Sequence, residues 1–193
     1  MILKAMEWLA RALAIVGGLV LTALVLLTCV SIMGRGANTL GHSDFLVGLA
    51  PAFAATLTNF GPVKGDFEVV ESGIAFSIFA FLPICQLHGG HATVDVFTNL
   101  LPKPVNRVIV AFWEVALTVL LVVISWRLYE GLVSKFNNGE TTFLLQFPIW
   151  WSYAASFAAS GAAAVVGVYC ALARVLGLVT GGHYLPRSEG ATH

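Results

Sequence analysis

The feature that most constrains this chain is a run of 22 residues, 12–33, that contains no charged side chain. As an α-helix the run would be about 33 Å long, which matches the hydrocarbon thickness of a bilayer. A secretory signal has a shorter apolar core that ends in a small-residue cleavage site, and no convincing site of that kind follows here. The run therefore predicts a retained transmembrane helix.

The composition places the whole chain in the same class. Hydrophobic residues make up 58% of the 193 residues and charged residues only 10%, and the mean hydropathy is +0.87. These values lie outside the range of soluble domains. Ten basic and ten acidic side chains cancel, so no surface for nucleic acid is expected. We predict an all-α integral membrane protein.

Four segments are long and apolar enough to cross a bilayer. They are residues 12–33, 68–87, 105–129 and 147–178. Pro148 is expected in the first turn of the fourth helix, where a missing N–H does no harm. Residues 45–60 are too few to span comfortably, so a surface-lying or re-entrant segment is favoured over a fifth span. Residues 92–101 predict a second interfacial helix, and 181–193 a polar tail.

The basic residues predict which side of the membrane holds the termini. An even number of spans puts both termini on one side, which would carry six basic residues against four on the other. The six are Lys4, Arg11, Lys103, Arg107, Arg174 and Arg187, and the four are Arg35, Lys64, Arg127 and Lys135. The excess predicts cytoplasmic termini and places the start of the second span at the outer face.

Acidic side chains gather where the second span begins. Glu68 and Glu71 are three residues apart, so they share one helix face near the positive end of the helix dipole. Asp66 is expected to cap the same helix. For Glu71, one turn deeper, a structural role and a role facing a partner or water both stay open.

Glu114 is an acid inside the third predicted span. It lies about 14 Å from the start of that span, near the expected bilayer centre. A carboxylate at such depth requires a partner. The candidates are a polar side chain on another span or on a second subunit, or a protonated or hydrogen-bonded state within the bundle.

Two further patterns bear on binding. His91 and Asp95 could share a helix face, but with His88 they offer too few nitrogen or sulfur donors for a transition metal, so a hydrogen-bonded His–Asp brace is favoured.

Small residues at every fourth position of the fourth span form a ridge that suits close packing in lipid, either within the chain or against a partner. The ridge consists of Ala155, Ala159, Ala163, Gly167 and Ala171.

Several short motifs occupy fixed places along the predicted spans. They are Arg35 after the first span; Gly65-Asp66-Phe67-Glu68 and Glu71 opening the second; Phe81-Leu82-Pro83 and Gln86 closing it; Gly90-His91 and Val94-Asp95; Gly139-Glu140-Thr141; and Leu145, Pro148, Trp150, Trp151 and Tyr153 opening the fourth. In this order and spacing they resemble the small membrane subunit of tripartite ATP-independent periplasmic (TRAP) transporters, the DctQ family. The resemblance covers about residues 5–178.

The resemblance implies a four-span subunit of the bacterial inner membrane with cytoplasmic termini. It implies two partners: a large, DctM-like permease subunit that carries solute and sodium, and a periplasmic, DctP-like solute-binding protein that delivers an organic acid or related solute. The small subunit would enlarge the static scaffold among the membrane lipids and help dock the binding protein. Sodium would bind the large subunit. One departure is that the loop over residues 36–64 is longer than is usual in this family.

Other function classes are less well supported by the sequence. A membrane anchor of a redox complex, the leading alternative, would need histidines within the spans to hold haem. A thiol-oxidising membrane enzyme would need a pair of cysteines at one face, whereas the three cysteines lie in different apolar segments. No nucleophile–base pair or phosphate-binding glycine loop occurs, so no enzymatic activity, metal or cofactor is expected.

Overall fold

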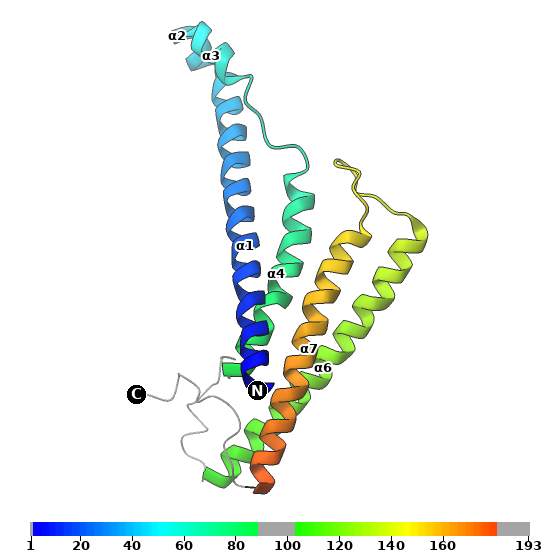
Figure 1. Ribbon diagram of the computed structural model, residues 1–193. Helices are drawn as coiled ribbons and strands as arrows, with labels where there is room; N and C mark the ends of the chain where they lie inside the picture. Colours follow the sequence, from blue (N-terminus) through cyan, green and yellow to red (C-terminus); the bar gives the residue numbers. More distant parts are fainter. Residues whose placement is uncertain (1, 89–102, 181–193) are drawn as a thin grey trace.

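The computed structural model in Figure 1 describes residues 2–88 and 103–180, and in these residues the chain is helical without a regular strand. The helices are α1 (Ile2–Gly41), α2 (Asp44–Leu49), α3 (Pro51–Leu57), α4 (Asp66–His88), α6 (Lys103–Asn138) and α7 (Trp150–Thr180). Four candidate membrane spans lie in α1, α4, α6 and α7. The predicted fold class, an all-α membrane protein with four spans, is confirmed.

The four long helices form two antiparallel pairs, α1 with α4 and α6 with α7, and the pairs meet where α4 packs on α7 (Figure 1). The end of the bundle at which α4 and α7 begin is called the distal end below, and lies at the top of Figure 1. The end at which α1 and α6 begin is the proximal end. The two pairs spread apart toward the distal end.

The α1–α4 pair packs closely because small residues face each other. A Cβ atom at Gly17 would lie only 2.9 Å from the Cβ of Ala80. Beside this contact, Ser77 Oγ donates a 3.3 Å hydrogen bond to the Gly17 carbonyl. Polar side chains can therefore bond across the pair because no bulky side chain separates the backbones.

The ridge of small residues on α7 is used mainly within the chain. Ala159 and Ala163 are fully buried, as is the neighbouring Val166, whereas Ala155 at the distal end is exposed. Of the two uses that the sequence left open for this ridge, packing within the bundle accounts for its middle part.

Helix α1 is much longer than the 12–33 segment predicted to cross the membrane. Its 40 residues correspond to about 60 Å, roughly twice the thickness of the hydrocarbon layer. Helices α2 and α3 fold back onto its distal end, beyond the distal ends of α4 and α7 (Figure 1). Asn38 Nδ2 holds the returning chain by donating to the carbonyls of Thr58 and Phe60, at 2.9 and 2.8 Å.

The segment predicted to lie on the surface, residues 45–60, is thus a pair of short helices. The chain breaks between them at Ala50, because the residue before a proline is disfavoured in helical conformation and Pro51 follows. The other predicted interfacial helix, residues 92–101, and the predicted tail, 181–193, lie outside the described residues.

Candidate functional site

A buried polar cluster joins three helices near the proximal end. Glu114 of α6 is 5% exposed. Its Oε2 lies 2.9 Å from Arg174 Nε of α7, and its Oε1 accepts a 2.8 Å hydrogen bond from Gln86 Nε2 of α4. Thr118 Oγ1 lies within reach of the same amide and donates to the Glu114 and Gly167 carbonyls, at 2.8 and 3.1 Å. The cluster therefore ties α4, α6 and α7 together.

The partner of Glu114 is in the same chain, on other spans. The hydrogen-bond partner Gln86 belongs to the last turn of α4. Gln86 is 20 residues beyond Asp66, so about 30 Å along the helix axis. Glu114 is therefore level with the last turn of α4, toward the proximal end of the bundle, and its depth in the bilayer stays a prediction.

Arg174 is the functional residue that sequence reasoning missed. The charge count treats it as a cytoplasmic surface residue, but its guanidinium neutralises Glu114 inside the bundle. A signal was present, since an arginine inside an apolar span requires a partner just as an acid does. Removing Arg174 from the count leaves five basic residues on the predicted cytoplasmic side against four on the other.

At the distal end, Asp66 joins α4 to α1. Its Oδ2 accepts a hydrogen bond from Ser31 and lies 4.0 Å from Arg35 Nη2, while Oδ1 accepts from the backbone N–H of Phe67 at 2.8 Å. Asp66 is the first residue of α4 and contacts the next N–H, so the predicted N-cap geometry is replaced by a link between helices. Ser31 also accepts from Val63 N, at 3.3 Å, which fixes the entry to α4.

Glu68 fastens the α6–α7 loop (residues 139–149) to the first turn of α4. Its two carboxylate oxygens accept hydrogen bonds from the backbone N–H groups of Leu144 and Leu145, at 2.6 and 2.9 Å. Gly65 makes room for this approach, because its φ is +75° and a Cβ there would lie 2.3 Å from Leu145 Cγ. The glycine-acid motif at the start of the second span thus serves to seat a distant loop.

Changing Glu68 to alanine is expected to release this loop. Both charge-assisted bonds are lost together, so amide hydrogen exchange at Leu144 and Leu145 should accelerate by about tenfold or more. Exchange measured by mass spectrometry on the purified protein tests this. The matched control is Glu71→Gln, on the same helix face but without a bond to the loop within the described residues; equal acceleration in both variants would contradict the assignment.

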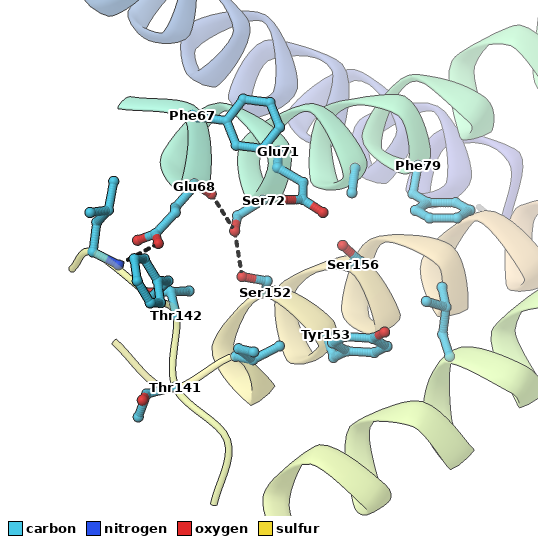
Figure 2. A pocket seen from close by; sticks show the side chains of 15 residues that line it. Phe67, Glu68, Glu71, Ser72, Phe79, Thr141, Thr142, Ser152, Tyr153 and Ser156 are labelled. Carbon is cyan, nitrogen blue, oxygen red and sulfur yellow. Dashed lines mark hydrogen bonds between the residues drawn. The ribbon is translucent and has the colours of Figure 1, made fainter. Parts of the chain in front are cut away.

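Glu71 instead points into a cavity of about 670 Å³ between α4, α7 and the α6–α7 loop (Figure 2). At the rim of this cavity Ser72 and Ser152 join the two helices through a 2.7 Å hydrogen bond between their hydroxyls. Deeper along α4, Phe79 forms part of its wall. The cavity is mostly apolar, with Glu71 as a carboxylate directed into it.

Glu140 lies in the α6–α7 loop and is paired within the chain. It accepts hydrogen bonds from Lys135 Nζ at 2.5 Å and from Asn138 Nδ2 at 3.1 Å. The Lys135 hydrogen bond, followed by that of Asn138, holds the pKa of the Glu140 carboxyl below its ordinary value of 4.5. Ile149 N donates to the Glu140 carbonyl at 3.0 Å, so the same residue also closes the loop.

The lowered pKa of Glu140 predicts a pH dependence of the loop. A carboxyl whose pKa falls on folding stabilises the structure above its unfolded pKa, and this contribution disappears as the pH falls through the folded value. Protection of the loop amides from hydrogen exchange should therefore decline below about pH 4.5. The decline should be steeper in the wild type than in Glu140→Gln. Amide exchange of residues 139–149 measured against pH tests this, and identical profiles for the two proteins would contradict it.

Pro148 and the two tryptophans frame the start of α7. Pro148 lies two residues before the helix, not in its first turn, because it pairs with Thr141 in an isolated β-bridge. Trp150 packs edge-on against Phe136 and Trp151, with ring centroids 5.5 and 6.1 Å apart. The contact between Phe136 and Trp150 joins α6 to α7 beside the loop. The predicted brace of His91 and Asp95 lies outside the described residues.

Two of the motifs that gave the resemblance therefore meet other parts of the described chain at the ends of α4: Glu68 binds the α6–α7 loop, and Gln86 binds Glu114. Comparison with protein families gives one match: the family model described as tripartite ATP-independent periplasmic transporters, DctQ component, covers residues 24–178. The chain belongs to the DctQ family. This membership identifies it as the small membrane component of a tripartite transporter and gives no support to a redox anchor. Neither the curated proteins nor the solved structures compared with this DctQ chain include a match.

No group of three or more His, Cys, Asp or Glu side chains able to hold a metal ion occurs in residues 2–88 and 103–180. The polar clusters of this DctQ chain instead join helices to one another and to the α6–α7 loop. Family membership implies a large permease and a binding protein as the other two components.

Proposed function

We propose that this DctQ chain is the static scaffold subunit of a sodium-coupled importer of organic acids or related solutes in the bacterial inner membrane. In this role it stabilises the large permease subunit and helps dock the periplasmic binding protein. Both termini lie in the cytoplasm, so the distal end faces the periplasm. Solute and sodium bind the large subunit and not this chain.

The scaffold role is supported mainly by the buried polar cluster, in which Glu114 is bonded to other residues of this chain. A subunit that moves a charged solute needs polar groups within the membrane that the solute can reach. Glu114 is 5% exposed, and its two carboxylate oxygens are bonded to Arg174 and Gln86. These groups are committed to holding helices together, as expected of a rigid part.

The exposed faces of the bundle support a role in assembly. In the most apolar stretch of α1 only 11% of the residues are buried within the chain, and Leu19, Leu26 and Met33 are 61–72% exposed. Such a surface must be covered by lipid or by another membrane subunit. At the distal end, the exposed Phe143 and Leu144 of the α6–α7 loop offer contact to a protein that approaches from the periplasm.

The test is reconstitution of the large subunit with and without this chain. Purified components are placed in vesicles with the binding protein, an inward sodium gradient and a mixture of organic acids, and uptake is followed by mass spectrometry. Uptake is expected only when both membrane subunits are present. Full uptake by the large subunit without this chain would overturn the scaffold role, and uptake that is independent of sodium would overturn the coupling.

A further inference from the structure

The cavity beside Glu71 contains polar groups without partners. Among residues 2–88 and 103–180, no hydrogen bond or ion pair joins the side-chain oxygens of Glu71 or Ser156 to another group. Figure 2 shows Glu71 and Ser156 directed toward the space between α4 and α7, whereas Tyr153 lies on the side of α7 that faces α6, where its ring packs against Gly131. Ser156 is only 3% exposed. Its hydroxyl faces the cavity, where it can bond a ligand or water.

The neighbouring acid, Glu68, already has hydrogen-bond partners. Glu68 also lines the cavity, but its two oxygens are bonded to the backbone of the α6–α7 loop. Glu71, three residues later on the same face, is left with its charge directed into the apolar space. The two acids of the motif thus have separate tasks, and only Glu71 is available to an incoming group.

The chemistry of these groups specifies a cationic ligand. A carboxylate only accepts hydrogen bonds, and the Ser156 hydroxyl can accept as well. An ammonium or guanidinium group supplies three to five donors together with the opposite charge. The apolar wall, which includes Phe79 and Leu128, suits the hydrocarbon stem of a lysine or arginine side chain.

A phospholipid headgroup fits less well. Within the described part of the chain, the residues that line the cavity include two glutamates and no lysine, arginine or histidine. The phosphate of a lipid would therefore lie beside Glu71 without a cation to balance it. A basic side chain of a protein brings positive charge alone.

The depth of the cavity indicates that its occupant belongs to a membrane protein and not to a soluble one. Phe79 is eight residues beyond Glu71, so the cavity extends about 12 Å further along α4 into the membrane span. At the rim, Phe67 and Phe143 are 72% and 90% exposed, and they continue the apolar surface outward. A membrane-embedded segment reaches both regions, whereas a soluble protein reaches only the rim.

We propose that the Glu71 cavity receives a lysine or arginine side chain from the neighbouring large membrane subunit. The inference rests on the proposed function, because it supposes that such a subunit binds this chain. Glu71 forms the ion pair, Ser156 accepts one of the remaining donors, and the exposed Phe67 at the rim packs against the apolar residues around the basic side chain. Basic side chains seated in this way often contribute strongly to an interface.

The first test is co-purification of the large subunit through a tag on this chain. Glu71→Gln is expected to reduce the recovered large subunit by about tenfold or more, because the partner's charge is left without a counter-ion. The matched control is Glu130→Gln, an exposed acid near the distal end that is already bonded to Trp126 and Arg127. Both variants should unfold at the wild-type temperature, since neither side chain is buried.

The second test identifies the occupant. A photo-crosslinking benzoylphenylalanine at Phe67 leaves Glu71 in place, and the adduct in the intact complex is mapped by mass spectrometry. The expected adduct is on the large subunit, next to a lysine or arginine. Exchanging the two charges, with Glu71→Lys and the partner's basic residue changed to glutamate, should restore the recovery lost in each single variant.

The outcomes separate this inference from the proposed function. If the wild-type chain does not retain the large subunit, both are overturned. If it does, and Glu71→Gln retains the same amount, only the ion pair is overturned. An adduct on lipid, on a second copy of this chain or on the binding protein would equally overturn the assignment of the occupant.

Discussion

Replacing Arg174 by methionine is expected to destabilise the isolated chain by about 3 kcal/mol, the largest effect among the substitutions considered. Methionine keeps much of the apolar stem, so the change removes mainly the guanidinium. Glu114, 5% exposed, is then left with Gln86 and without a counter-ion. Reversible unfolding in mixed detergent micelles, followed by circular dichroism, measures the free energy.

Two controls show whether the loss comes from the unpaired charge. Arg127→Met removes an arginine from an exposed pair with Glu130 and should leave the unfolding midpoint nearly unchanged. The double variant Glu114→Gln, Arg174→Met removes both charges and should recover most of the stability lost in Arg174→Met. A double variant as unstable as the sum of the two single variants would show that the two residues act independently.

Replacing Gly34 by alanine is expected to cost about 2 kcal/mol and to detach the segment that returns from α3 to α4. A Cβ at this position would lie 2.2 Å from the carbonyl oxygen of Gly61, and a backbone atom cannot move aside as a side-chain end can. The returning chain must therefore shift away from α1. That shift would break the bonds of Asn38 to Thr58 and Phe60.

The matched control is Gly36→Ala, two residues further along the same helix. No described atom lies within 4 Å of a Cβ built there, so alanine should be neutral or stabilising by up to about 1 kcal/mol through its helix propensity. Amide exchange over residues 58–63 and the unfolding midpoint report the difference. Equal exchange in the two variants would show that Gly34 is not the point of contact.

The local role of the acids was predictable from their position, but the partner of each was not. The spacing of Glu68 and Glu71 placed them on one helix face, and both do line one cavity. The spacing does not predict that Glu68 accepts a hydrogen bond from the backbone N–H of Leu144, which is 76 positions away. The sequence likewise indicated that Glu114 needs a partner, while Arg174 was assigned to the surface because it lies close to the end of its apolar segment.

The sequence by itself determined that this chain is a four-span helical membrane protein, because long uncharged runs have only one low-energy state in a bilayer. The order of its motifs also pointed to the family that the family model confirms. Only the tertiary structure decided which polar groups are already bonded and which remain available. Glu68, Glu114 and Glu140 find partners within the chain, whereas Glu71 faces a cavity. The reason is that burial and hydrogen bonding depend on distances between helices, which the pattern along one helix does not contain.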